Sequence, residues 1–143
     1  MKISEEVLFP VLIVNAFIKK EDKYLAIKRA KEVEVGCWET PGGKVELNEK
    51  VEDALKREIK EELNVEVKIN KFLGFGEGVN CPTELKFDIH RFVLYFECEI
   101  VSGNIKFDQE EISDHKWVTL EEFKKLKPLS KPIYDFFNRF GGF

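Results

Sequence analysis

Apolar and polar positions follow two different periods along the chain, and each change of period marks an expected element. The apolar, β-branched residues 9–18 and the apolar residues 24–29 flank a short polar turn, which predicts a β-hairpin. From Glu49 to Leu63 the apolar residues recur at helical spacing without a break, so we expect a helix there. Asn64 is then expected to end this helix in a left-handed conformation, and residues 65–69 alternate as a strand does.

The second half of the chain repeats this mixture of strands and helices. Further strands are predicted at residues 72–75, 87–101 and 116–118, with a break in the pattern at residues 80–83. Thr119 and Glu122 have the spacing of a capping box, which predicts a helix through about residue 126, and a last helix is expected over residues 130–140. The hairpins exclude a purely parallel sheet. We therefore expect one α/β (α+β) domain over residues 1–143, with a mixed β-sheet flanked by helices.

Composition narrows the class of protein. With 143 residues, 43% of them hydrophobic and 35% charged, the chain can bury a core, so an intrinsically disordered protein is excluded. The net charge is -4 and the pI is about 5.4, so no overall positive field attracts a nucleic acid. No apolar run is long enough for a membrane helix, and the first residues lack the pattern of a signal peptide, so we expect a cytoplasmic protein. Three cysteines without metal-ligand spacing favour neither a disulfide framework nor a zinc site.

The predicted helix over residues 49–63 places acidic side chains where core residues are expected. Val51, Ala54 and Leu55 define its apolar face, Glu58 and Glu62 point to the middle of the same face, and Glu61 lies on its flank. Two carboxylates about 6 Å apart repel each other by roughly 3 kcal/mol at an effective dielectric constant of 20. Raised pKa values, basic partners or divalent cations would relieve that repulsion, and oxygen ligands without His or Cys favour Mg²⁺ or Mn²⁺.

The residues around these carboxylates form a spaced motif. The chain runs Gly43, five residues, Glu49, seven residues, Arg57-Glu58-Ile59, one residue, Glu61-Glu62, one residue, Asn64-Val65. This resembles the Nudix box, Gly-x5-Glu-x7-Arg-Glu-U-x-Glu-Glu-x-Gly-U, the signature of the Nudix hydrolase family. One fixed position departs from the pattern, because Asn64 stands where the box has glycine. Asparagine tolerates a left-handed conformation better than other residues with a side chain, so the helix cap is expected to survive.

The resemblance implies a fold and a reaction. Nudix enzymes have an α/β/α sandwich and use Mg²⁺, or Mn²⁺ in its place, to hydrolyse a nucleoside diphosphate linked to another moiety. On this chain the implied metal ligands are the carboxylates of Glu58, Glu61 and Glu62 and the carbonyl of Gly42. The implied catalytic residues are Arg57 and a general base, which is either Glu58 or Glu61.

Four further assignments follow from the resemblance with looser spacing. A loop carboxylate, Glu111 or its neighbour Glu110, is expected to be a further ligand or base. Glu49 and Arg57 are placed to form an ion pair that braces the loop against the helix, with an ordinary surface salt bridge as the alternative. Arg29 and Lys44 are candidate substrate-binding residues that pair with phosphate oxygens, although either could be an ordinary surface charge. No role is assigned to the isolated histidines, His90 and His115.

The substrate is the least readable property. The leading hypothesis is a nucleoside triphosphate, including a modified one, cleaved to the monophosphate and pyrophosphate, because the chain is small and its carboxylate set is complete. ADP-ribose or a nucleotide sugar is the alternative, suggested by Pro82, and a nucleotide sensor that no longer cleaves is a third hypothesis. The expected partner is a small nucleotide. The Phe-rich residues 136–143 belong either to the core or to a homodimer surface.

Overall fold

The sheet and its helices are described by a computed structural model that covers residues 9–85, 87–141 and 143. In chain order the elements are β1 (Val11–Lys20), β2 (Lys23–Arg29), β3 (Trp38–Glu39), β4 (Gly42–Lys44), α1 (Val51–Leu63), β5 (Glu66–Pro82), β6 (Asp88–Ser102), β7 (Ile112–Val118), α2 (Leu120–Lys124) and α3 (Lys131–Phe140). None of the helices in this described part is long and apolar enough to cross a membrane.

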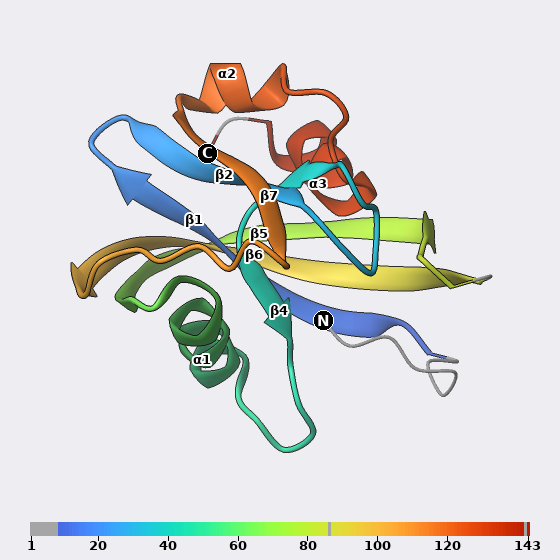
Figure 1. Cartoon of the computed structure of the whole chain (residues 1–143), viewed down its shortest axis with the longest axis horizontal. Coiled ribbons are helices and arrows are strands. Elements are labelled where there is room, and N and C mark those ends of the chain that lie inside the picture. The colour runs from blue at the N-terminus through green and yellow to red at the C-terminus, as the bar shows by residue number, and fades with distance from the viewer. Residues whose placement is uncertain (1–8, 86, 142) are drawn as a thin grey trace.

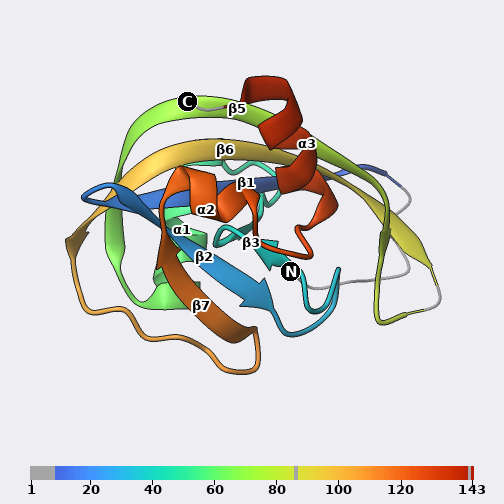
Figure 2. The same ribbon diagram turned by 90° about the horizontal axis from the view of Figure 1, so that it is seen from above.

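The strands form one mixed sheet, as the sequence predicted. Its order is β3-β2-β1-β6-β5, with β4 also paired to β1 and β7 also paired to β2. β1 and β6 run parallel, whereas β1 is antiparallel to both β2 and β4. Seen from above, β2 and β7 turn away from the long curve of β5 and β6 (Figure 2). β1 therefore lies at the centre of the molecule and contacts both parts of the sheet.

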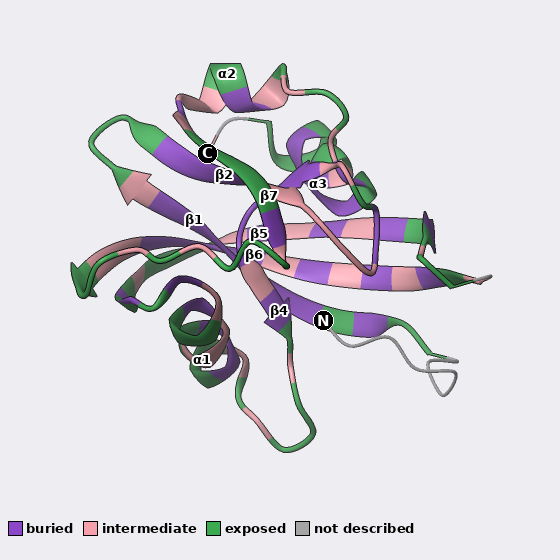
Figure 3. Cartoon of the chain, in the orientation of Figure 1, coloured by how far each residue is buried: buried purple, intermediate pink, exposed green. Residues whose placement is uncertain are grey.

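Helices cover both faces of this sheet, which confirms the predicted layers. Figure 1 shows α2 and α3 on one side and α1 on the other. One apolar cluster, with Phe17, Tyr95 and Phe136, lies between the sheet and the pair α2 and α3, and a second, with Leu25 and Leu55, lies between the sheet and α1. Buried positions concentrate on the strand segments between the helices (Figure 3). Burial of these two clusters is the main source of stability and fixes where α1 sits.

Helix α1 begins two residues later than predicted and ends where predicted. Lys50 occupies the N-cap position, so Glu49 belongs to the preceding turn rather than to the helix. Asn64 has φ 62° and ψ 31°, the left-handed conformation expected of it, and its N–H donates a hydrogen bond to the carbonyl of Lys60. Asparagine therefore serves as the cap that glycine usually supplies.

Strand boundaries in the second half were predicted less well. β5 is one continuous strand up to Pro82, whereas the sequence predicted two short strands and a break at residues 80–83. Its pairing with β6 shifts register between Ile69 and Lys71, between Phe72 and Gly74 and again after Gly78. Each such irregularity interrupts the period-two alternation, so one bent strand resembles several short ones in the sequence.

The C-terminal region contains the predicted capping box and the Phe-rich tail. The capping box of α2 is present, since Thr119 and Glu122 each accept a hydrogen bond from the other's backbone N–H, although α2 ends earlier than predicted. Phe136 and Phe137 of α3 are buried, and the ring of Phe143 packs on Phe17. Phe136 and Phe137 therefore belong to the core and Phe143 packs against it, whereas Phe140 is 39% exposed.

Candidate functional site

Helix α1 carries the acidic side chains of the site next to its buried residues. Ala54, Leu55, Ile59 and Leu63 are buried against the sheet, and this anchors the helix beside β4. At the point where β4 passes the helix, a Cβ atom on Gly43 would collide with the carboxylate of Glu58. Glycine at this position therefore leaves the Glu58 carboxylate in place between strand and helix.

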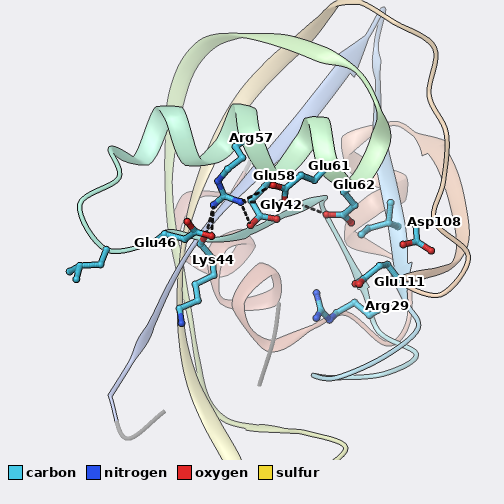
Figure 4. A pocket seen from close by; sticks show the side chains of 12 residues that line it. Arg29, Gly42, Lys44, Glu46, Arg57, Glu58, Glu61, Glu62, Asp108 and Glu111 are labelled. Atoms are coloured by element: carbon cyan, nitrogen blue, oxygen red, sulfur yellow. Dashed lines mark hydrogen bonds and ion pairs between the residues drawn. The ribbon is translucent and has the colours of Figure 1, made fainter. Parts of the chain in front are cut away.

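A pocket of about 590 Å³ opens beside these carboxylates. It is lined by residues from β2, β4, α1 and the loops around them, namely Ile27, Arg29, Gly42, Lys44, Glu46, Leu47, Arg57, Glu58, Glu61, Glu62, Asp108 and Glu111. Figure 4 shows the α1 side chains on one wall and Arg29, Asp108 and Glu111 on the opposite wall. The predicted site residues thus meet at this pocket with two exceptions: Glu49, which binds the lining residue Arg57, and Glu110, the alternative to Glu111.

Arg57 connects several residues on the α1 side of the pocket. Its guanidinium forms two hydrogen bonds with the Glu49 carboxylate, Nε to Oε2 at 2.8 Å and Nη2 to Oε1 at 2.9 Å, so the predicted contact is present. Nη1 also pairs with Glu58 at 2.9 Å and with Glu61 at 3.3 Å. Nη2 further donates to the carbonyl of Lys44 at 3.1 Å. These bonds tie the turn before α1 to two carboxylates of the pocket, and they lower the pKa of Glu49.

The three carboxylates of α1 differ in burial and in partners. Burial raises the pKa of Glu62 to about 7, although the charge of Arg29 and a 3.3 Å hydrogen bond from the Gly42 N–H both favour its ionised form. Burial also raises the pKa of Glu58, against the opposing effect of Arg57. The Glu61 side chain is 60% exposed. Burial therefore disfavours ionisation of these two carboxyl groups even with Arg29 and Arg57 nearby, and a further positive charge would favour it.

The opposite wall contains one predicted carboxylate and one that the sequence analysis missed. Glu111 lines the pocket and forms an ion pair with Lys31 at 3.1 Å. Its neighbour Glu110 is exposed and is not among the lining residues, so Glu111 is the better placed of the two candidates. Asp108 also lines the pocket. Sequence analysis missed it because loop residues between two strands have no periodicity, although an acidic residue in the same loop as Glu111 was a signal.

The two basic candidates lie at different parts of the pocket. Arg29 is partly buried, and its Nε donates a 2.6 Å hydrogen bond to the carbonyl of Val33, which fixes the guanidinium at the end of β2. Burial and the charge of Arg91 lower the pKa of Arg29. Lys44 lines the pocket from β4 and is exposed. A held guanidinium at Arg29 is the better preorganised group for phosphate oxygens.

The donor set of the pocket suits a hard divalent cation. Its candidate ligands are carboxylate oxygens and a carbonyl oxygen, with no His or Cys among the lining residues. No three acidic, His or Cys side chains among the described residues are grouped closely enough to hold an ion as they stand. Arg57 binds oxygens of Glu58 and Glu61, and the remaining lone pairs of these carboxylates stay available to a cation.

Known proteins are similar to this chain over most of its length. The NUDIX domain model matches residues 10–140. An ADP-ribose pyrophosphatase of Methanocaldococcus jannaschii is 45% identical over 119 residues, which are 83% of this chain and 68% of that protein. The nucleoside triphosphatase NudI of Escherichia coli is 32% identical over 117 residues, 77% of this chain and 82% of that protein.

Solved structures show the same similarity. The MutT protein of Methanosarcina mazei Go1 superposes with a TM-score of 0.76 at 26% identity, over 94% of this chain and 96% of that one. The MutT NUDIX hydrolase of Burkholderia pseudomallei gives a TM-score of 0.72 at 28% identity, over 85% of this chain and 91% of that one. The motif of residues 43–65, the fold around it and these matches together show that the chain belongs to the Nudix hydrolase family and is a Nudix pyrophosphohydrolase.

Proposed function

We propose that this chain hydrolyses the diphosphate of a nucleoside diphosphate derivative with Mg²⁺, or Mn²⁺ in its place. The observation that carries the proposal is the pocket, which is large enough for a diphosphate and is lined by six acidic residues: Glu46, Glu58, Glu61, Glu62, Asp108 and Glu111. An anionic substrate is repelled by such a lining unless cations neutralise both. The proposed ligands are Glu58, Glu61, Glu62 and the Gly42 carbonyl, with Glu111 opposite; the bound cation would supply charge neutralisation and acidify a water molecule.

The residues of the pocket have separable tasks in this proposal. Arg57 keeps Glu58 and Glu61 oriented, and Arg29 pairs with phosphate oxygens from the opposite wall. Of the two candidates for the general base, Glu61 is the more exposed and has the longer bonds to Arg57, 3.3 and 3.5 Å. We therefore assign the proton-accepting task to Glu61 in addition to its place among the ligands, and assign only the ligand task to Glu58 and Glu62.

ADP-ribose is the first substrate that we propose, which reverses the order favoured by the sequence alone. The reason is the 45% identity to a protein named ADP-ribose pyrophosphatase, over 83% of this chain. Pro82 adds nothing to this choice, because it ends β5 and is not among the residues that line the pocket. A nucleoside triphosphate is the second candidate, supported by the similarity to NudI at 32% identity.

The test is product analysis with a substrate panel. ADP-ribose, nucleotide sugars and normal and oxidised nucleoside triphosphates are incubated with the protein in Mg²⁺, in Mn²⁺ and in chelator. We expect ADP-ribose to give AMP and ribose 5-phosphate only when a metal is present. The variant Glu62→Gln keeps the shape of the side chain and removes one ligand charge, so its kcat/KM should fall by on the order of 10³-fold.

A matched control is available on the same helix. Glu52 is exposed in the first turn of α1 and does not line the pocket, so Glu52→Gln should retain wild-type activity. Hydrolysis in chelator, or wild-type activity of Glu62→Gln, would overturn the metal site. Faster cleavage of a triphosphate would select the second candidate, and nucleotide binding without turnover of any compound would select the sensor hypothesis.

A further inference from the structure

The loop between β6 and β7 is held by a ring stack that the sequence did not reveal. The ring of Phe107 in this loop stacks on the imidazole of His115 in β7, with centroids 3.8 Å apart and planes inclined by 15°. His115 stands opposite Ile27 of β2, and Ile27 lines the catalytic pocket. The stack therefore fixes the loop directly beside the pocket, one residue before Asp108.

A second contact ties the same loop to the catalytic helix. The N–H of Lys106 donates a 2.9 Å hydrogen bond to the carbonyl of Leu63, the last residue of α1. Ile105 and Phe107 are partly buried against the apolar cluster beneath α1. The loop is thus attached on one side to the end of α1, next to Glu62, and on the other side to β7.

Asp108 and Glu111 are held by different means. The Asp108 carbonyl accepts hydrogen bonds from the N–H groups of Glu111 and Ile112, and its Oδ1 accepts one from Glu110. Its Oδ2 has no hydrogen-bond partner among the described residues, and Asp108 is one of the residues that line the pocket. Glu111 is instead fixed by its ion pair with Lys31 and by its carbonyl, which accepts from the N–H of Ala30. Loss of the ring stack should therefore displace the Asp108 side chain more than the Glu111 side chain, which keeps its own ion pair with Lys31.

We propose that Asp108 is a further carboxylate ligand for the divalent cation, and that His115 is a positioning residue that acts on Asp108 through the ring of Phe107. This proposal rests on the proposed function, since it uses the same pocket. His115 is not among the residues that line the pocket. Its contribution is to restrict where the Asp108 carboxylate can lie relative to Glu62 on the opposite wall (Figure 4).

The test measures Mn²⁺ binding without substrate, from the electron paramagnetic resonance signal of free Mn²⁺, together with turnover. His115→Ala should raise the Mn²⁺ concentration at half-saturation by about 2- to 10-fold, the range expected from loss of one stacked ring pair. His115→Phe keeps a flat ring and should restore wild-type binding. Asp108→Asn should weaken Mn²⁺ binding at least as much as His115→Ala. The double variant should bind Mn²⁺ like Asp108→Asn alone, because both changes act through one carboxylate.

The controls separate positioning from stability and from the reaction itself. Lys116→Ala changes an exposed neighbour on β7 that does not line the pocket, and it should leave Mn²⁺ binding unchanged. Additive effects of His115→Ala and Asp108→Asn, or a His115→Phe variant as weak as His115→Ala, would overturn the proposal. The proposal would also be overturned if the Tm of His115→Ala fell so far that unfolded protein accounted for the weaker Mn²⁺ binding. Since Mn²⁺ binding needs no substrate, failure of every compound in the panel would contradict the proposed function alone.

Discussion

Two glutamates show how this fold separates a structural carboxylate from a functional one. Glu39 in β3 is fully buried and accepts hydrogen bonds from the N–H and hydroxyl of Thr40 and from the hydroxyls of Tyr95 and Ser130. Glu62 in α1 is partly buried and accepts one hydrogen bond among the described residues, from the N–H of Gly42.

Burial raises the pKa of both carboxyl groups, so the pKa direction alone does not distinguish them. The difference lies in unused hydrogen-bonding capacity. The oxygens of Glu39 are occupied by donors of the protein itself, whereas those of Glu62 face a pocket and keep lone pairs for a ligand. Counting satisfied oxygens is therefore the better guide to which buried acid carries chemistry.

The largest expected effect on stability comes from replacing Glu39. In Glu39→Gln the amide places donor hydrogens against the hydroxyls and N–H that now donate to the carboxylate, so buried donors lose their acceptor. The free energy of unfolding should fall by about 3 kcal/mol, measured by urea denaturation. Activity per folded molecule should stay near wild type, since Glu39 does not line the pocket.

Glu62→Gln is the mirror image of that variant. Glu62→Gln should lose activity and keep its stability, whereas Glu39→Gln should lose stability and keep its activity. An unchanged denaturation midpoint in Glu39→Gln, or a collapse of stability in Glu62→Gln, would contradict the distinction.

The second effect sharpens the comparison through pH. The pKa of Glu62 is raised from 4.5 to about 7, so between these values the folded protein holds a proton that the unfolded chain releases. The stabilisation is complete below pH 4.5 and is lost as the pH rises through about 7. In chelator, wild-type stability should therefore fall relative to Glu62→Gln from pH 5 to pH 8. Denaturation at a series of pH values measures this, and a constant difference would contradict the raised pKa.

Cation binding should also depend on that proton. A divalent cation displaces it, so the apparent affinity for Mg²⁺ should rise from pH 6 to pH 8 in the wild type and lose this dependence in Glu62→Gln.

The smallest effect concerns the cap two residues after Glu62. Glycine adopts the left-handed conformation of Asn64 without strain but adds freedom to the unfolded chain, so Asn64→Gly should change stability by less than about 1 kcal/mol. Its kcat/KM should stay within about twofold of wild type, because no carboxylate moves. Asn64→Ala, which strains the same conformation, should destabilise by about 1–2 kcal/mol. A large loss of activity in Asn64→Gly would show that the asparagine side chain itself has a role.

Features that depend on nearby residues could be predicted from the sequence. The acidic face of α1, the left-handed Asn64 and the contact of Glu49 with Arg57 all lie within one short segment, where helical geometry fixes the spacing. The capping box of α2 is equally local. Arg29 and Glu111 were named from the resemblance, and the structure places both at the pocket.

Features that depend on residues far apart in the chain could not be predicted from the sequence. The Glu39 network joins β3, β6 and the N-cap of α3, and no local pattern marks Tyr95 or Ser130 as its members. The stack of Phe107 on His115 likewise joins a loop to the strand after it, and His115 alone gave no signal. The register shifts of β5 interrupt its alternation of apolar and polar residues, so the sequence predicted several short strands where the structure has one.

The parallel pairing of β1 with β6 also bears on how this protein is made. Val11 lies opposite Arg91, and the pairing continues to Ile18 and Cys98, so the centre of the sheet joins segments from the two halves of the chain. On the ribosome, the β1–β2 hairpin and α1 emerge long before β6 does. The apolar faces of the hairpin and α1 therefore stay exposed until β6, through residue 98, has left the exit tunnel. Slow translation through β5 would lengthen that exposure and increase the demand for chaperones.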